Sequence, residues 1–281
     1  GVDIGGTFTD LVFLTTDGRL QKRKVSSTPQ DYAEAIVAGI EDALGTDDIR
    51  PHVQEIVHAT TVATNAILER RGARTALITT HGFRDVLELR RIRIPLSYDL
   101  GWEKPPPLAE RALRFEIKER LDHKGRVLVP LDLSAIDEIV QTCKNEEVTA
   151  IAICLLHAYR NAEHEHRVRD AIRAHLPDIH ISLSSEILPE MQEFERVSTT
   201  VVNAYVAPLI AEYLANLRRK LDAIETPAPI LVMQSNGGLV PSQTASERPV
   251  SIIESGPAAG VVAALQASLD AGQRNVDRRH R

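Results

Sequence analysis

The first ten residues, Gly1–Asp10, read GVDIGGTFTD and run directly into the apolar stretch Leu11–Leu14. A short apolar strand ends here in a carboxylate, Asp3, and two glycines then make a tight turn. Glycines at a turn let backbone N–H groups approach an anion that a Cβ atom would hold away. This stretch therefore predicts a loop that holds phosphate.

Several residues of the loop are predicted to bind phosphate or the metal ion that accompanies it. The candidate phosphate-binding residues are Gly5, Gly6, Thr7 and Thr9, the last two as hydroxyl donors. Asp3 and Asp10 are candidate catalytic residues, because carboxylate oxygens are the ligands that Mg²⁺ prefers. Asp3 is also the candidate metal ligand. The alternative is a plain Gly-Gly hairpin with exposed threonines and solvated carboxylates.

The residues after the glycines decide between classes of phosphate loop. In P-loop and dinucleotide-binding folds the glycine loop opens a helix. Here Phe8, Leu11 and Phe13 predict a second strand, and Asp17-Gly18 predicts a two-residue turn into a third strand, Arg19–Val25. Neither rival motif, Gly-Lys-Ser/Thr or G-x-G-x-x-G, occurs in the sequence. The prediction is a strand–turn–strand phosphate loop.

The composition indicates a globular protein. The 281 residues are 43% hydrophobic and 26% charged, with only 4% aromatic residues and a net charge of −6. Few aromatic residues and a negative charge argue against nucleic acid and anionic membranes as partners. The two cysteines, Cys143 and Cys154, have no C-x-x-C spacing, so we expect free thiols and a cytoplasmic location.

Further along the chain, strands and helices alternate. This rhythm predicts a mixed α/β sheet with flanking helices, in the order of a ribonuclease-H-like half. Residues 91–130 interrupt the rhythm and are interpreted as an insertion with a hairpin over Arg114–Val129. Two helices are expected to meet near Pro208, and a disordered tail is expected over 271–281. The expected domains are 1–190 and 191–270.

A second group of polar residues is predicted to face the cleft beyond the sheet. His58 is a candidate catalytic residue, and the candidate substrate-binding residues are Thr60, Thr61, Asn65 and Asn236. Helix capping explains Thr60 or Thr61 equally well. His164, His166, His175 and His180 are interpreted as a solvated face rather than a metal site, because i,i+2 residues on a helix diverge.

Several stretches are similar to the hydantoinase/oxoprolinase family, in particular to its A-type subunits. They are Asp3–Asp10, His58–Asn65, Arg71–Thr80, Gly82–Asp85, Ser182–Glu186, Glu195–Tyr205, Met233–Gly238 and Ser255–Gly260. The resemblance implies an actin-like ATPase fold with two ribonuclease-H-like lobes around ATP and Mg²⁺. It also implies opening of a cyclic amide, such as 5-oxoproline or a hydantoin, by phosphorylation of the amide oxygen, with a hydantoinase B-type subunit or domain as partner.

The sequence also departs from the family. Members carry a second Asp-x-Gly-Gly-Thr loop after the small-residue stretch, and no such loop occurs here. The interpretation is an N-terminal lobe whose second lobe is missing or lies on another chain. The alternatives are the ATP-using subunit of a ketone carboxylase, a truncated inactive remnant and, more distantly, a sugar kinase.

Overall fold

The computed structural model describes residues 1–28, 30–44, 52–91 and 101–272. Two compact units divide the chain: unit 1 comprises Gly1–Arg71 and Leu209–Arg281, and unit 2 comprises Gly72–Pro208. The expected domains, 1–190 and 191–270, follow chain order, whereas unit 1 takes segments from both ends of the chain. Apart from residues 271 and 272, the expected disordered tail lies outside the described residues.

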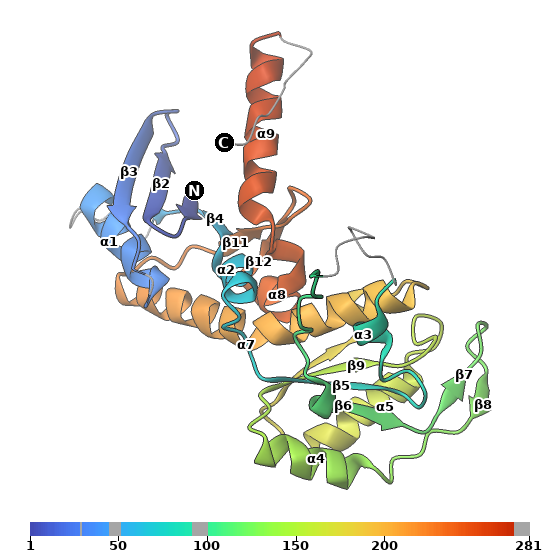
Figure 1. The fold of residues 1–281 in the computed structure, drawn as a ribbon. Coiled ribbons are helices and arrows are strands. Elements are labelled where there is room, and N and C mark those ends of the chain that lie inside the picture. The colour runs from blue at the N-terminus through green and yellow to red at the C-terminus, as the bar shows by residue number, and fades with distance from the viewer. Residues whose placement is uncertain (29, 45–51, 92–100, 273–281) are drawn as a thin grey trace. The chain divides into compact units, whose positions relative to one another are not determined.

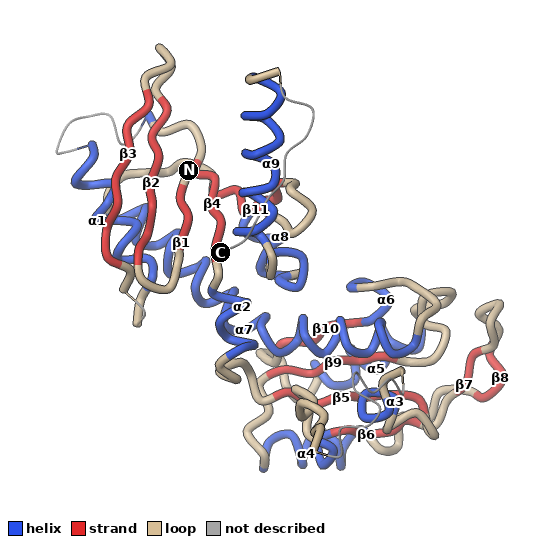
Figure 2. Tube along the Cα trace, turned by 45° about the horizontal axis from the view of Figure 1, so that its top comes forward, coloured by secondary structure: helices blue, strands red, loops and turns tan. Residues whose placement is uncertain are grey.

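Unit 1 is built on a six-stranded mixed sheet in the order β12-β11-β4-β1-β2-β3 (Figures 1 and 2). The pairs β1–β4 and β4–β11 are parallel, and β1–β2, β2–β3 and β11–β12 are antiparallel. A hairpin followed by parallel strands is the mixed α/β arrangement that the sequence predicts. The strands are β1 (Val2–Ile4), β2 (Phe8–Leu14), β3 (Leu20–Ser26), β4 (Ile56–Thr60), β11 (Ile230–Met233) and β12 (Leu239–Pro241).

The sheet of unit 1 has two unlike faces around β1 and β2. On the covered face, Val2, Ile4 and Leu11 are buried, and α1 packs against β2 and β3. On the open face, Asp3 and Asp10 are exposed. Successive side chains of a strand point to opposite faces, which explains this alternation. The helices of unit 1 are α1 (Tyr32–Leu44), α2 (Val62–Leu68), α8 (Ser242–Glu247), the 3₁₀ helix η3 (Pro249–Ile252) and α9 (Ser255–Asp270).

The β2–β3 hairpin differs from the predicted two-residue turn. Thr15 N donates to Arg19 O at 3.0 Å, and Gly18 N donates to Thr15 O at 2.9 Å. The loop is therefore three residues long, residues 16–18, and Gly18 adopts a positive φ of 83° at its last position. This is the geometry of a three-residue hairpin with a left-handed glycine. The pairing of the two strands is shifted by one residue from the predicted register.

Unit 2 contains a four-stranded, fully parallel sheet in the order β10-β9-β5-β6. Its strands are β5 (Thr75–Thr80), β6 (Arg114–Ile117), β9 (Ala150–Cys154) and β10 (His180–Leu183), and a separate hairpin pairs β7 (Arg120–Leu121) with β8 (Val127–Val129). The helices are α3 (Val86–Leu89), the 3₁₀ helix η2 (Arg111–Leu113), α4 (Ile136–Asn145), α5 (Glu163–Arg173) and α6 (Ser184–Ile187). Because β6 is an integral strand, the 91–130 segment is not a surface insertion throughout; residues 92–100 lie outside the described residues.

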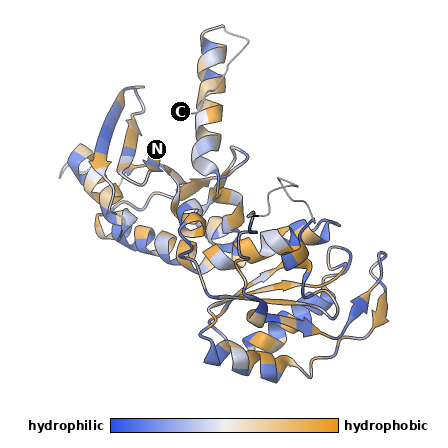
Figure 3. Cartoon of the chain, in the orientation of Figure 1, coloured by the Kyte–Doolittle hydropathy of each residue, from blue (hydrophilic) through white to orange (hydrophobic). Residues whose placement is uncertain are grey.

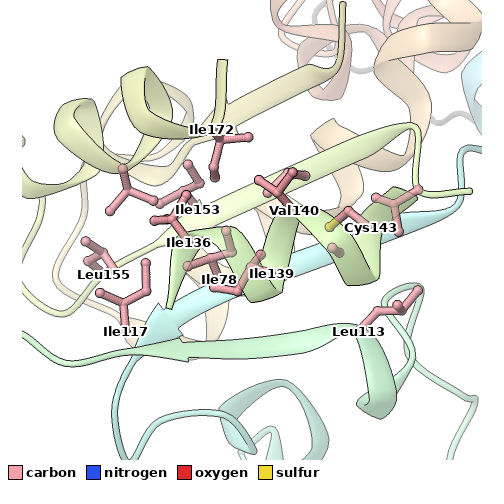
Figure 4. Close-up of a cluster of buried hydrophobic side chains, with 14 of the residues drawn as sticks. Ile78, Leu113, Ile117, Ile136, Ile139, Val140, Cys143, Ile153, Leu155 and Ile172 are labelled. Atoms are coloured by element: carbon pink, nitrogen blue, oxygen red, sulfur yellow. The ribbon is translucent and has the colours of Figure 1, made fainter. Parts of the chain in front are cut away.

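Both faces of the unit 2 sheet are buried. One face packs on α4 and α5, where Ile78 and Ile153 meet Ile139, Val140 and Ile172 (Figure 4). The other carries Leu77, Ala152 and Cys154 against residues 197–204, which belong to helix α7 (Glu193–Ala223). Strands buried on both faces tend to consist of continuous apolar residues rather than alternating ones, as in β9, whose residues are AIAIC. Figure 3 colours the chain by hydropathy, and orange segments run through the sheet of unit 2. Cys143 and Cys154 are buried free thiols, as expected.

One continuous helix, α7 (Glu193–Ala223), replaces the two helices expected to meet near Pro208. Proline removes one N–H donor and so one hydrogen bond within a helix. Here the helical hydrogen bonds on either side maintain the helix through that residue. None of the helices in the described ranges is long and apolar enough to cross a membrane.

Candidate functional site

The glycine turn after β1 is held by its own hydrogen bonds and by Ser27, the residue that follows β3. Gly5 N donates to Phe8 O at 3.0 Å, which closes the turn, and Ser27 N donates to Thr7 O at 2.9 Å. The Ser27 hydroxyl donates to Gly5 O at 2.8 Å. A Cβ atom added at Gly6 would meet no atom within 4 Å. The turn is thus fixed by its own hydrogen bonds, and space remains over Gly6 for an anion.

Asp3 and Asp10 lie side by side on the open face. They are directly opposite each other in the β1–β2 pairing. Partial burial, followed by the neighbouring carboxylate of Asp10, raises the pKa of Asp3 above its ordinary value. Lys24 Nζ lies 3.1 and 3.2 Å from the two carboxylate oxygens of Asp10. A partly buried carboxylate beside a second carboxylate favours a bound cation.

These residues fit Mg²⁺ in the form in which it accompanies phosphate. Within the described ranges there is no group of three or more His, Cys, Asp or Glu residues that could hold a metal ion. Mg²⁺ does not need one, because it is commonly bound by one or two carboxylates with water and substrate phosphates as the other ligands. Asp3 would supply the protein oxygen, and the amides of the glycine turn would face the phosphate.

The structure places Thr9, His58 and Thr60 on the covered face, away from Asp3. Thr9 is buried and its hydroxyl lies 3.0 Å from Ser27 Oγ. Thr60 Oγ1 accepts from the backbone N–H of Val62, the first residue of α2, at 3.1 Å. The phosphate role predicted for Thr9 and the substrate role predicted for Thr60 are not supported by these positions, because alternation along a strand sends their side chains to the opposite face.

His58 is a core histidine in this structure. It is fully buried, its Nδ1 lies 3.4 Å from Val2 O, and its Nε2 lies 2.7 Å from the hydroxyl of Tyr213. Burial lowers the pKa of His58 to about 4. Both ring nitrogens are engaged on the covered face, so the catalytic role predicted for His58 does not fit its surroundings.

Thr61 and Asn65 lie beyond the carboxyl end of β1. The Thr61 hydroxyl donates to Ile4 O at 3.1 Å, and Asn65 Nδ2 donates to Thr61 Oγ1 at 3.3 Å. Asn65 also lines an open pocket of about 770 Å³ in unit 1, between the start of α1, α2 and the second half of α7. The structure brings Thr61 to the same end of β1 as the glycine turn, whereas Asn65 faces this pocket.

Asn236 lies in the loop between β11 and β12, and β11 is separated from β1 by β4. Its Oδ1 accepts from Gly238 N at 2.8 Å, and Gly237 has a positive φ of 85°. The side chain of Asn236 therefore holds its own loop. Its predicted role in substrate binding stays a prediction.

The histidines of unit 2 are not all solvated. His164 is 3% exposed, and its Nδ1 lies 2.8 Å from Glu119 Oε2. Glu119 in turn contacts the hydroxyl of Thr80. His166 and His175 keep exposed side chains beside Glu186 and Asp137. The interpretation of a solvated face is thus wrong for His164, because the apolar face of α5 includes this residue.

Sequence reasoning missed Lys24 and Ser27. Both follow from the hairpin register: a three-residue loop pairs Asp10 with Lys24, whereas a two-residue loop pairs Asp10 with Val25. A one-residue shift moves every side chain of a strand to the other face. The signal was present in Thr16-Asp17-Gly18, with glycine at the third position of the loop.

Comparisons with known proteins agree with this architecture. Residues 1–176 match the hydantoinase/oxoprolinase N-terminal region, and residues 196–276 match the hydantoinase/oxoprolinase domain. The chain is 36% identical to the alpha chain of caprolactamase from Pseudomonas jessenii over 283 residues, covering 98% of this chain and 41% of that one. It is 33% identical to 5-oxoprolinase 1 of Arabidopsis thaliana over 291 residues, covering 93% of this chain and 23% of that one.

Two solved structures resemble the chain closely. The ATP-dependent caprolactamase from Pseudomonas jessenii superposes with a TM-score of 0.87 at 35% identity, covering 96% of this chain and 40% of that one. Nucleotide-free acetone carboxylase gives a TM-score of 0.86 at 28% identity, covering 97% of this chain and 40% of that one. The chain thus spans about two fifths of these structures. With the glycine turn, the paired aspartates and both family regions in place, the chain belongs to the hydantoinase/oxoprolinase family.

Proposed function

We propose that this chain is the phosphate-binding part of an ATP-dependent enzyme that opens a cyclic amide. The observation that carries the proposal is the open face of unit 1, where Asp3 and Asp10 stand beside a glycine turn with free space over Gly6. Relatives that share this part of the chain include an ATP-dependent caprolactamase and a 5-oxoprolinase.

The chemistry starts from the stability of an amide. Its carbonyl is a poor electrophile, so the proposed reaction transfers the γ-phosphoryl group of ATP to the amide oxygen and releases ADP. Water then attacks the activated carbon, the ring C–N bond breaks, and an acyl phosphate and a free amine result. A second water attacks the acyl carbon and releases phosphate with the original amide oxygen. In this sequence the glycine turn holds the phosphates, and Asp3 supports the Mg²⁺ that offsets their charge.

The same site suits a second reaction. Acetone carboxylase is nearly as similar in structure as caprolactamase, with TM-scores of 0.86 and 0.87. A ketone that loses an α-proton has an enolate oxygen that can accept the γ-phosphoryl group, with release of ADP. Water then breaks the P–O bond of the enol phosphate and phosphate leaves, and the enolate carbon attacks CO₂ to form the new C–C bond. The second candidate is therefore the ATP-using component of a ketone carboxylase. A partner chain is expected for either reaction, since the matched caprolactamase chain is itself one of the subunits of its enzyme.

One experiment separates these candidates. The protein at its full natural length, with any partner chain, is incubated with Mg-ATP and caprolactam, 5-oxoproline, a hydantoin or acetone with bicarbonate. We expect ADP release and ring-opened product with a lactam or hydantoin, and transfer of ¹⁸O from a labelled amide carbonyl to phosphate. Ring opening that consumes no ATP would contradict the proposal, and carboxylation of acetone alone would favour the second candidate.

Two variants tie the activity to the open face. Asp3→Asn should reduce turnover by about 100-fold or more, an effect typical of removing one group that stabilises transition-state charge. Asp17→Asn, in the exposed loop of the β2–β3 hairpin, is the matched control and should retain activity. Full turnover by folded Asp3→Asn protein would exclude this site.

A further inference from the structure

The pocket between the start of α1, α2 and the second half of α7 combines an apolar part with charged side chains. Its volume is about 770 Å³, and the residues that line it belong to unit 1. The apolar part includes the buried residues Val62, Ala66 and Tyr213. A pocket of this size with few polar groups is typical of sites for small molecules. The charged residues that line it are Asp31, Glu69, Arg71, Glu212 and Arg219.

Three of these five charges already have a partner in the protein. Asp31 lies 2.7 Å from a lysine ammonium group, and Arg71 pairs with Glu69 at 3.1 Å. Among the residues that the structure describes, Glu212 and Arg219 have no ion-pair partner. The pocket therefore presents one carboxylate and one guanidinium group whose charges no other side chain offsets.

Glu212 and Arg219 lie on the same line along α7. Seven residues make almost two helical turns, so the two positions share one face and are roughly 10 Å apart along the helix axis. Between them lies Ala215, which is exposed and has only a methyl group as its side chain. Asn216 Oδ1 accepts from Arg219 Nη2 at 2.5 Å, and Asn216 Nδ2 donates to Asp31 Oδ1 at 2.9 Å. The result is a strip of helix surface with opposite charges at its two ends and a positioned guanidinium group.

A ligand that fits this strip has an ammonium group at one end, a chain of methylene groups and a carboxylate at the other end. Its ammonium group would lie by Glu212, and its carboxylate by Arg219, because the fork of guanidinium N–H groups matches a carboxylate. An α-amino acid does not fit, since one carbon atom carries both of its charged groups. Polyanions such as nucleotides are disfavoured, because three carboxylates and two guanidinium groups line the pocket.

We propose that this pocket binds an ω-amino acid, a zwitterion whose two charges are separated by a methylene chain. Hydrolysis of a lactam releases this class of molecule, because cleavage of the ring C–N bond leaves the amine and the carboxylate at opposite ends of the chain. Only the identification of the ligand as a reaction product rests on the proposed function; the binding rests on the pocket. Since none of the described residues that line the pocket belongs to Gly1–Asp10, the ligand and phosphate would occupy separate sites.

The test begins with two isomeric ligands, 6-aminohexanoate and 2-aminohexanoate. They contain the same atoms, and only the distance between the two charges differs. The protein at its full natural length is titrated with each ligand and followed by calorimetry or by NMR chemical shifts. We expect saturable binding of 6-aminohexanoate, with a dissociation constant on the order of a millimolar or below for a molecule of this size. Binding of 2-aminohexanoate should be at least about tenfold weaker, because it loses one of the two charged contacts.

Two variants assign the ends of the ligand. Glu212→Gln should weaken 6-aminohexanoate binding about tenfold and leave the affinity for hexanoate unchanged, because hexanoate has no ammonium group to lose a partner. Arg219→Gln should weaken 6-aminohexanoate binding to a similar extent and leave the affinity for hexylamine unchanged. The matched control is Asp222→Asn, which removes an exposed carboxylate of α7 that does not line the pocket, and it should keep all of these affinities.

The role of the pocket would be overturned if folded wild-type protein showed no saturable binding of 6-aminohexanoate. It would also be overturned if Glu212→Gln and Arg219→Gln bound this ligand as tightly as wild type, or if 2-aminohexanoate bound equally well. Normal binding of 6-aminohexanoate by a protein that opens no lactam with ATP would instead overturn the proposed function and leave the ligand of the pocket unchanged.

Discussion

At the scale of single residues, the face of a strand on which a side chain lies determines whether it can belong to the site, more than its residue type does. Asp3 and His58 are both polar residues near the end of a strand, and the sequence alone predicts a site role for each. The structure separates them: Asp3 is exposed on the open face, and His58 is buried beside Tyr213. Which face of a sheet is covered by helices depends on packing between segments far apart in the sequence, and no local sequence pattern indicates it.

The buried position of His58 makes the stability of unit 1 depend on pH. Its folded pKa is about 4, against 6.5 for the free side chain. Between these values the unfolded chain binds a proton that the folded chain does not, so the free energy of unfolding falls as the pH falls. The full loss is about 3 kcal/mol. Denaturant unfolding at pH 7 and pH 5 should show a steeper decrease in wild-type protein than in His58→Gln.

Other groups titrate in the same range, so the comparison is between slopes. The two proteins share every carboxylate, and only the contribution of residue 58 differs. Equal slopes would mean that His58 is charged in the folded protein, against its position between Val2 and Tyr213.

At the scale of elements, the sequence predicts which segments are helix and strand better than how they are joined. The strand after Asp17-Gly18 is confirmed, because it depends on local periodicity and turn chemistry. The predicted loop length before β3 and the predicted break between two helices near Pro208 are both wrong. In both cases the sequence offers one local signal, a turn dipeptide or a proline, and the surrounding hydrogen bonds of the strands or the helix determine the structure instead.

The contact between α1 and β2 gives an element-scale prediction. A Cβ atom at Gly39 would lie 2.5 Å from Leu11 Cδ1, whereas one at Gly6 would meet no atom within 4 Å. Gly39→Ala should lower the free energy of unfolding by about 1–3 kcal/mol through overpacking, offset in part by the better helix propensity of alanine. Gly6→Ala should leave stability nearly unchanged and weaken the binding of Mg-ATP.

Chemical denaturation and calorimetric titration with Mg-ATP, run on both variants, check this pair. If Gly39→Ala were as stable as wild type, α1 would not pack tightly against Leu11 of β2. If Gly6→Ala bound Mg-ATP normally, phosphate would not approach the backbone of the glycine turn.

At the scale of the whole molecule, unit 2 is inserted into unit 1 between residues 71 and 209. Its two ends meet within it, since Ala73 N donates to Tyr205 O at 2.8 Å. It has its own core on both faces of its sheet. The sequence alone does not predict this insertion, because nothing in the sequences of β4 and β11 indicates that these two strands pair with each other.

We expect residues 72–208 to fold as an isolated domain, because its termini are adjacent and its core is internal. The excised segment should give a mixed α/β circular dichroism spectrum and a single cooperative thermal transition. A fluctuating state with secondary structure but no cooperative transition would show that unit 2 depends on the rest of the chain. The variant Gly72→Ala should destabilise the excised domain, since its Cβ would lie 2.1 Å from the Tyr205 ring.

The insertion also imposes an order of events on a growing chain. Ile56 of β4 and Ile230 of β11 are paired in the sheet of unit 1, yet all of unit 2 is synthesised between them. A ribosome adds roughly 5–20 residues per second, so β4 waits on the order of ten seconds for its partner strand. During that interval the edge of β4 toward β11 is unpaired, and unpaired strand edges promote aggregation. When unit 2 folds early, its two ends come together and the distance between β4 and β11 along the chain is bridged. Folding of the inserted unit therefore allows the sheet of unit 1 to be completed.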